Sequence, residues 1–297
     1  MQTWFNQLTG NVRGAIFGLI AAAMFTVVSA LVKFAAQDYH VVQILFFRQS
    51  VMLLTMLPII AGNFPQSLRT KRPLLHITRL LGALTALSLG FTAVAHLPLA
   101  TAISISFTKT MFVTVLAVVL LSEVVGWRRF LAILIGFIGM LIILQPNPGD
   151  VVSIYAFLAI IGAAGAALAV VCVRSLSSTE DAVTLLSYQS IFIGILVAIP
   201  TFYLWKTPDL IGLIVLVSVG LVSALAQWLG VKSYKAGEVS VVTGMEYTKL
   251  IYATMIGILV FSEWPDTNTF IGAAIIISAS AFTIWRENKI KAKIEPK

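Results

Sequence analysis

The segment LATAISISFTKTMFVTVLAVVLLSEV at residues 99–124 recurs 140 residues later, at residues 239–264, as VSVVTGMEYTKLIYATMIGILVFSEW. Several dipeptides keep this spacing. They are Thr-Lys at 108–109 and 248–249, Ser-Glu at 122–123 and 262–263, and Gln-Ser at 49–50 and 189–190. The chain is therefore expected to consist of two related halves, residues 1–150 and residues 151–297.

The composition indicates a membrane protein. Apolar residues make up 59% of the chain and charged residues 11%, against roughly 45–50% and 25% in soluble domains. A membrane-spanning helix needs about 20 mostly apolar residues, because its backbone polar groups find no water in lipid. Ten stretches meet this need, at about 14–35, 41–61, 73–95, 99–121, 127–145, 153–174, 182–204, 210–232, 238–261 and 267–285. We expect an all-α membrane protein with ten transmembrane helices and no soluble catalytic domain.

The number of spans in each half predicts how the halves are arranged. Five spans are an odd number, so the second half would enter the bilayer upside down relative to the first. Inverted repeats of this kind are typical of alternating-access transporters, which bind substrate near the midplane between the repeats. The sequence therefore predicts two inverted five-helix repeats and a carrier function.

The distribution of positive charge predicts the orientation in the membrane. The net charge is +8, which alone could suggest a nucleic-acid partner. Sorting the twenty Lys and Arg residues by the predicted spans puts fourteen on one side, two on the other and four within spans. The positive-inside rule then places both termini in the cytoplasm. The basic excess is a topology signal and predicts no nucleic-acid partner.

Five ionisable residues within the predicted spans are the main functional candidates. They are Arg48, Arg79, Lys109, Glu246 and Lys249. A charge at membrane depth costs about 2.5–3.5 kcal/mol even on a mild scale, so such residues are functional by default. Lys109 and Lys249 are equivalent in the repeat and would face one central cavity, where they could bind an anionic or zwitterionic ligand.

Helical spacing adds three candidate substrate-binding residues. Ser106 and Phe112 share a predicted helix face with Lys109, and Tyr252 shares one with Lys249. Other interpretations stay open. Glu246 and Lys249 could form an ion pair within one helix, and Glu246 could couple transport to protons. The positions of Arg48 and Arg79, about seven residues inside their spans, would also allow their side chains to reach the interface.

No catalytic, metal or cofactor motif is recognisable. The three histidines, His40, His76 and His96, are scattered near span ends, and neither an HExxH pattern nor a phosphate-binding glycine loop occurs. The single cysteine, Cys172, excludes an internal disulfide. The first apolar run is long enough to span a membrane and is expected to be a retained helix. A bacterial inner (cytoplasmic) membrane is the expected location.

Two stretches carry a resemblance to a known family. Residues 99–146 and the matching residues 239–287, each with its Ser-Glu dipeptide, resemble the EamA-type branch of the drug/metabolite transporter superfamily. Within that branch the chain is similar to bacterial S-adenosylmethionine uptake carriers. The pieces that carry this similarity are Phe46-Phe47-Arg48, Arg72-Pro73, His76-Ile77-Thr78-Arg79, Pro265-Asp266 and Gly272-Ala273. The resemblance implies a ten-helix carrier that moves metabolites through a central cavity, and it favours a functional role for Arg48 and Arg79.

These expectations combine into a secondary transporter for a small polar metabolite. Two lysines in the cavity would repel a cationic sulfonium, so the charge balance favours a carboxylate-bearing organic anion or amino acid. The alternative is a carrier or exchanger of S-adenosylmethionine or a related nucleoside metabolite. The expected partners are the substrate, the lipid bilayer and either a coupling proton or a counter-substrate, whereas the sequence does not predict an oligomeric state.

Overall fold

The structure, a computed structural model, describes residues 9–62, 64–65, 68–121, 127–144, 151–176, 179–237 and 239–294. Within these ranges the regular elements are all helices. In chain order they are α2 (Gly10–Ala35), α3 (Val41–Gly62), α4 (Pro73–His96), α5 (Leu99–Ser106), α6 (Lys109–Leu121), α7 (Trp127–Leu144), α8 (Val151–Leu176), α9 (Ala182–Tyr188), the π-helical turn η2 (Gln189–Ile193), α10 (Gly194–Tyr203), α11 (Leu210–Ala236), α12 (Val239–Glu246), α13 (Thr248–Phe261) and α14 (Thr267–Ile294). The described residues of all ten predicted spans are mainly helical.

Seven segments of the described chain are long and apolar enough to cross a membrane by length and composition, which makes the chain a multi-pass membrane protein. They cover the predicted spans one to four and six to eight. The fifth and tenth contain shorter apolar helices, at Phe130–Ile143 and Thr267–Ala279. The ninth is divided between α12 and α13.

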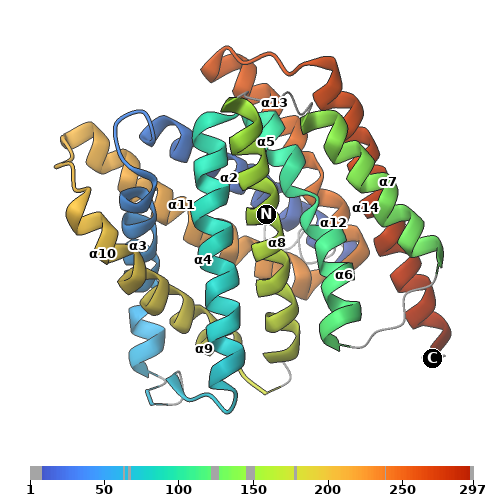
Figure 1. Ribbon diagram of the computed structural model, residues 1–297. Helices are drawn as coiled ribbons and strands as arrows, with labels where there is room; N and C mark the ends of the chain where they lie inside the picture. The colour runs from blue at the N-terminus through green and yellow to red at the C-terminus, as the bar shows by residue number, and fades with distance from the viewer. Residues whose placement is uncertain are drawn as a thin grey trace.

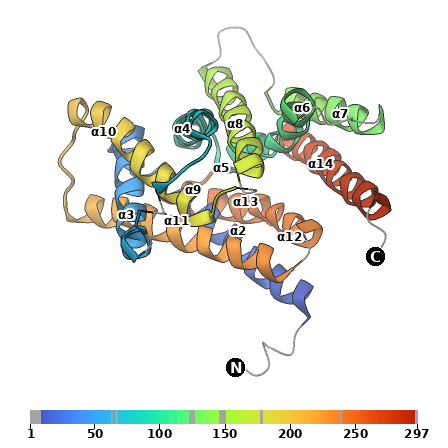
Figure 2. The ribbon, with the colours of Figure 1, turned by 90° about the horizontal axis from the view of Figure 1, so that it is seen from below.

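The helices form one bundle whose neighbours come from distant parts of the chain. α7 and α14 lie side by side along one edge, α3 and α10 lie along the opposite edge, and α4 and α8 pair between them (Figure 1, Figure 2). We call side A the end of the bundle at which α3 and α8 finish and α4 and α9 begin. Side B is the opposite end, at which α2, α4 and α13 finish.

Glycine allows two of these helix pairs to approach closely. A Cβ atom on Gly82 of α4 would lie 2.7 Å from the carbonyl oxygen of Gly165 in α8. A Cβ atom on Gly139 of α7 would lie 2.9 Å from the carbonyl oxygen of Gly272 in α14. Lipid is as apolar as a leucine side chain, so membrane helices associate mainly through close packing that small residues permit. These glycines therefore hold the first half of the chain against the second.

The substitution Gly82→Ala tests this packing. The new methyl group would meet the Gly165 backbone, which cannot move aside as a flexible side chain can, so we expect a loss of about 1–3 kcal/mol in stability. Gly90→Ala, in the same helix, is the matched control because a Cβ atom placed there would meet no described residue within 4 Å apart from its own helix backbone. Thermal unfolding in detergent should show a lower Tm for Gly82→Ala only. Equal Tm values for both variants would contradict the proposed role of the close contact.

Candidate substrate cavity

Two helices at the centre of the bundle are interrupted at equivalent points of the repeated segment. The turn Phe107–Thr108 separates α5 from α6, and Tyr247 separates α12 from α13. The threonine hydroxyl beside each break donates to the carbonyl oxygen three residues earlier, at 2.7 Å for Thr108 and 2.6 Å for Thr248. Hydroxyls that bond back to their own helix compete with its regular bonding and bend it. The repeated Thr-Lys dipeptides thus coincide with helix breaks that the sequence did not predict.

The two breaks lie against each other. The ring centroids of Phe107 and Tyr247 are 5.4 Å apart with the ring planes inclined at 62°. Each break carries a lysine just after it, Lys109 as the first residue of α6 and Lys249 as the second residue of α13. The interrupted helices therefore bring charged groups to the middle of the bundle, where a membrane protein otherwise avoids them.

A cavity of about 630 Å³ opens beside the second break. Its volume falls in the usual range of about 300–1,000 Å³ for small-molecule sites. The described residues that line it are Gly18, Ala21, Ala22, Phe25, Met52, Met56, Ile59, Val183, Leu186, Ala224, Gln227, Trp228, Gly230, Val231, Ser233, Tyr234, Lys235, Val242, Glu246 and Lys249. They belong to α2, α3, α9, α11, α12 and α13, and on α3 and α11 they occupy the half nearer side A. The walls are mostly apolar and aromatic, and the charged members are Lys235, Glu246 and Lys249.

Glu246 and Lys249 form the polar centre of this cavity. The Lys249 ammonium lies 3.2 Å from Glu246 Oε2, and the Tyr234 hydroxyl donates to Glu246 Oε1 at 3.0 Å. The side chains of Lys249 and Glu246 are 20% and 32% exposed, so both remain accessible from the cavity. Lys249 also lies 5.1 Å from the ring centroid of Phe25. The ion pair that the sequence left open is therefore present, although a helix break separates its two members.

Lys109 approaches the same carboxylate without touching it. Among the described residues it forms no ion pair within 4.0 Å, yet it acts electrostatically on Glu246 together with Lys249. Lys109 is half-buried, and the described cavity lining does not include it. The structure thus brings both lysines near one carboxylate but exposes only Lys249 to the cavity.

The three candidates chosen from helical spacing lie elsewhere. Phe112 packs against Phe137 of α7, with ring centroids 5.3 Å apart. Ser106 donates its hydroxyl to Ile103 O at 2.7 Å, within its own helix. Tyr252 is half-buried and is absent from the described cavity lining. The break between α5 and α6 separates Ser106 from Lys109, so these two residues do not share the continuous helix face that the spacing assumed.

Arg48 is buried and bonds to neutral groups. Its side chain is 4% exposed. Nε donates to Ser223 Oγ at 3.2 Å and Nη1 donates to Gln49 Oε1 at 2.5 Å. Gln49 Nε2 in turn donates to the backbone oxygen of Gln189 at 3.1 Å. Arg48 therefore does not extend to the membrane interface but joins α3 to α11 and, through Gln49, to the seventh predicted span.

Arg79 completes this network from the other side. It is 3% exposed, and it donates to the carbonyl oxygen of Leu185 at 3.0 Å and to Gln189 Oε1 at 2.9 Å. Its Nε is buried without a hydrogen-bond partner among the described residues. The two arginines are thus linked through Gln49 and Gln189, which are equivalent in the repeat. Neither arginine lines the described cavity.

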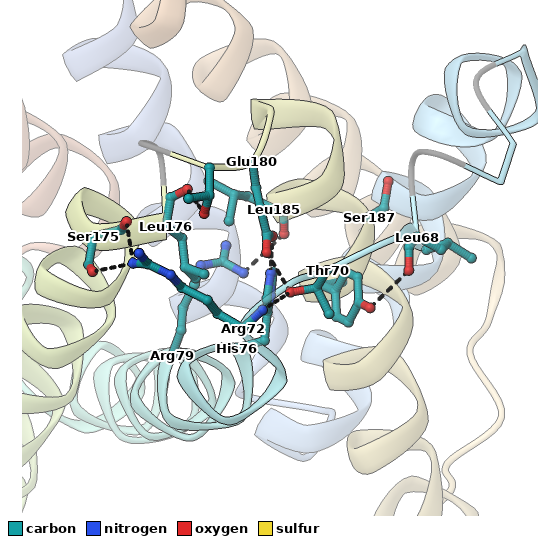
Figure 3. Close-up of polar contacts among 12 residues, drawn as sticks. Leu68, Thr70, Arg72, His76, Arg79, Ser175, Leu176, Glu180, Leu185 and Ser187 are labelled. Carbon is teal, nitrogen blue, oxygen red and sulfur yellow. Dashed lines mark hydrogen bonds and ion pairs between the residues drawn. The ribbon is translucent and has the colours of Figure 1, made fainter.

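A second set of polar residues lies at side A (Figure 3). It joins the segment before α4 and the first turns of α4 to α9 and to the last residues of α8. Glu180 accepts from the Thr70 hydroxyl and pairs with His76 Nε2, Arg72 contacts the Ser175 oxygens at 3.3 and 3.4 Å, and the Tyr188 hydroxyl donates to Leu68 O at 3.0 Å. We call Thr70, Arg72, His76, Ser175, Glu180 and Tyr188 the side-A cluster.

Side B is bridged by Lys33 and Glu263. The Lys33 ammonium lies 2.6 Å from Glu263 Oε1 and donates to Leu97 O at 2.5 Å. Glu263 Oε2 accepts from the backbone N–H of Leu99 at 2.9 Å. Its equivalent in the first half, Glu123, lies outside the described residues. These bonds join α2 and α5 to the end of α13, so the first and second halves meet at side B.

Several of these residues gave little sequence signal. Tyr234 is twelve positions before Glu246 on another helix, and Glu180 is 104 positions after His76. Neither spacing fits a local motif. Gln49 and Gln189 did carry a signal, because both belong to the repeated Gln-Ser dipeptide. Within the described residues, no group of three or more His, Cys, Asp or Glu is placed to hold a metal ion.

Known proteins similar to this chain include several named transporters. An S-adenosylmethionine uptake transporter of Rickettsia bellii is 27% identical over 88% of this chain and 89% of its own length. A riboflavin transporter of Vibrio cholerae is 29% identical over 93% and 95%. A pseudopaline exporter, CntI, of Pseudomonas aeruginosa is 28% identical over 90% and 94%. These proteins carry different small molecules, and their names include both uptake and export.

The fold comparison and the family comparison agree. A solved structure described only as "Crystal structure of protein" matches with a TM-score of 0.60 at 14% identity, over 95% of this chain and 98% of that one, and shows the shared fold alone. The profile of the EamA-like transporter family matches residues 12–145 and again residues 153–285. Together with the membrane-competent helices, these matches identify a small-molecule transporter rather than an enzyme. The chain belongs to the EamA-like transporter family.

Proposed function

We propose that the chain is a secondary transporter that moves a carboxylate-bearing metabolite, an organic anion or an amino acid, by alternating access through the cavity. The observation that carries this proposal is the Lys249 ammonium, which is partly exposed to an otherwise mostly apolar cavity at membrane depth. Charge-assisted hydrogen bonds are roughly twice as strong as neutral ones, and low dielectric strengthens them further. A substrate carboxylate would gain both advantages at Lys249.

The balance of charge in the interior supports an anionic group on the substrate. The five ionisable residues predicted within spans comprise four cations and one carboxylate, Glu246. Lys249 pairs with Glu246, and Lys109 reaches it only through a longer-range interaction. Buried charge is stable only when it is compensated. A carboxylate bound at Lys249 would reduce this imbalance, and Glu246 would remain available for a substrate ammonium group.

We also propose that the two halves, residues 1–150 and 151–297, are inverted five-helix repeats with ten transmembrane spans. The pairing of helices supports this. In such a repeat, span one corresponds to span six and span three to span eight. The contact of α2 (span one) with α11 (span eight) then has its counterpart in the contact of α8 (span six) with α4 (span three). α7 with α14 and α3 with α10 each pair corresponding spans. The separate family matches to each half give independent support.

We assign side A to the cytoplasm and the chain to the bacterial inner membrane. Most loop Lys and Arg residues belong to side A, which is what the positive-inside rule requires. The cavity lies towards side A, whereas Lys33 and Glu263 bridge side B. This arrangement fits a state that is closed at side B and whose cavity lies nearer the cytoplasm. A substrate would shift the population between such a state and the opposite one by its differential affinity for them.

The second candidate substrate is S-adenosylmethionine. The named function of the Rickettsia relatives favours it, and its methionine end carries both a carboxylate and an ammonium group. These would meet Lys249 and Glu246, while the apolar and aromatic walls would receive the adenosyl part. Its sulfonium would be repelled by the lysines, which is why a simpler carboxylate remains the preferred substrate.

The substitution Lys249→Ala tests the proposed carboxylate site. Losing one charge-assisted hydrogen bond costs about 1.5–3 kcal/mol, so we expect transport affinity to fall roughly 10- to 100-fold. Lys109→Ala should weaken transport as well, while the protein still folds and inserts. Uptake into proteoliposomes is the measurement. Lys206→Ala is the control, because its ammonium forms an exposed ion pair with Asp38 at side B, away from the cavity. Full transport by both Lys249→Ala and Lys109→Ala would contradict the proposal.

The substitution Glu246→Gln separates the substrate classes. For a dicarboxylate, Glu246 competes for Lys249, so removing its charge should strengthen binding. For an amino acid or S-adenosylmethionine, Glu246 pairs with the ammonium group, so the same change should weaken binding. Ligand-dependent thermal shifts with succinate, methionine, S-adenosylmethionine and riboflavin provide the measurement. Stabilisation by riboflavin alone, unaffected by Lys249→Ala, would reject a carboxylate-bearing substrate.

A further inference from the structure

We propose that α9 is a movable gate at the side-A mouth of the cavity, that it turns about η2, and that the side-A cluster together with Arg79 holds it closed. α9 is seven residues long, and its Val183 and Leu186 form part of the cavity wall. A displacement of α9 would therefore change access to Glu246 and Lys249. The gate depends on the proposed carrier function but not on the identity of the substrate.

The π-helical turn supplies a place for this movement. η2 spans Gln189–Ile193 and connects α9 directly to α10. π-helical turns are rare, and most occur as single turns at functional sites. Gly194 follows at once, and the nearest atom to a Cβ built there is Gln49 Cβ, at 3.6 Å. The seventh predicted span thus changes its hydrogen-bonding pattern at the boundary between the gate segment and the rest of the helix.

Among the described residues, Arg79, His76 and Leu68 of the first half of the chain hold α9 and its junction with η2. Arg79 of α4 donates to the carbonyl oxygen of Leu185 within α9 and to Gln189 in η2. The Tyr188 hydroxyl donates to Leu68 O, and the Tyr188 ring lies against His76, with centroids 4.2 Å apart. Figure 3 shows Arg79 and His76 of α4 beside Leu185 of α9. A hinge is a few residues at the end of an element that absorb a large backbone change, so release of these bonds would allow α9 to turn about η2.

The His76–Glu180 pair is the charged part of this closure. The two side chains are only 2% and 3% exposed, and Glu180 lies two residues before α9 begins. Removing one partner of a buried hydrogen-bonded pair leaves the other group without its partner and weakens the contact. The pair is therefore the contact whose loss should most readily release α9. The outward face of the cluster is formed by Arg72 with Ser175.

A labelling experiment tests the gate. In a Cys172→Ser background, Leu186→Cys reports access to the cavity wall through alkylation by a membrane-impermeant maleimide applied from side A. We expect Glu180→Gln to raise the labelling rate roughly fivefold, the factor that about 1 kcal/mol of lost stabilisation produces. Arg72→Gln, which loses an exposed contact, should give a smaller increase. Lys206→Gln at side B is the control and should leave the rate unchanged.

The hinge is tested in the same assay. Gly194→Ala has room for its methyl group and should stiffen the helix, since alanine favours helix over glycine by about 1 kcal/mol. It should reduce the increase caused by Glu180→Gln while leaving Tm unchanged or higher. If folded Glu180→Gln and Arg72→Gln both label at the parental rate, α9 is not a gate. If Glu180→Gln instead loses transport but labels faster than the parent, the result supports the gate for any substrate.

The pH dependence of stability provides a second test. Burial raises the pKa of Glu180, but hydrogen bonds from Thr70 and His76 lower it more, so its pKa lies below the ordinary value of 4.5. Five neighbours bear on this carboxyl group and should be kept constant. They are Thr70, Lys71, whose backbone N–H donates to it, His76 and Arg79 of α4, and Tyr188 of α9.

A lowered pKa in the folded state fixes the sign of this dependence. The stabilisation from ionised Glu180 is fully present above its unfolded pKa and is lost as the pH falls through its folded pKa. The Tm difference between the parent and Glu180→Gln should therefore persist at neutral pH and shrink in acid below pH 4.5. A difference that stays constant into strong acid would show that the Glu180 charge does not hold the cluster.

Discussion

The crossing of two interrupted helices at Phe107 and Tyr247 is the feature on which the centre of the molecule depends. Backbone groups freed by a helix break cannot bond to lipid, so such breaks occur only where protein covers them or lines a cavity. Here Phe107 is buried, and the Thr108 and Thr248 hydroxyls occupy carbonyl oxygens beside the breaks. The crossing therefore has to lie inside the bundle, and the helices around it are arranged to enclose it.

Each break also creates a helix start in the middle of the protein. α6 begins at Lys109, and α13 begins one residue before Lys249. Helix N-termini carry partial positive charge from their aligned peptide dipoles, so a lysine in the first turn adds to a positive potential instead of cancelling it. Discontinuous helices use such N-termini to face anionic substrate groups in other carriers. The position of the lysines, costly for folding, is consistent with a site that attracts carboxylates.

The buried arginines solve the same charge problem differently. Arg48 and Arg79 bond to amide, hydroxyl and backbone oxygens, and Gln49 and Gln189 connect them. Neutral acceptors disperse a guanidinium charge through directional bonds. Because these contacts join both halves at buried positions, the arginines have a structural role in holding the halves together. The lysines at the breaks differ, since Lys249 keeps part of its ammonium exposed to the cavity.

The sequence predicted the spans well because apolar length is a strong and local property. It also located the Thr-Lys dipeptides and the buried arginines, since repeats and intramembrane charges are visible without coordinates. It placed Ser106 on one continuous helix with Lys109, because threonine is compatible with an unbroken helix and periodicity assumes one, whereas the helix is broken between them. It also missed Glu180 as the partner of His76, since that pair is made by tertiary packing of segments far apart in the chain.

The two ends of the bundle show how related halves can diverge in function. In the proposed inverted repeat, the loop after α2 corresponds to the loop after α8. The first places Tyr39 against Asp209 at 3.2 Å and Asp38 against Lys206 in an exposed pair. The second places Glu180 in a buried pair with His76. Exposed pairs contribute little to stability, whereas a buried group that loses its partner costs more. The loop after α8 therefore holds its neighbours at side A more firmly than the loop after α2 does at side B, and the cavity with Lys249 lies towards side A.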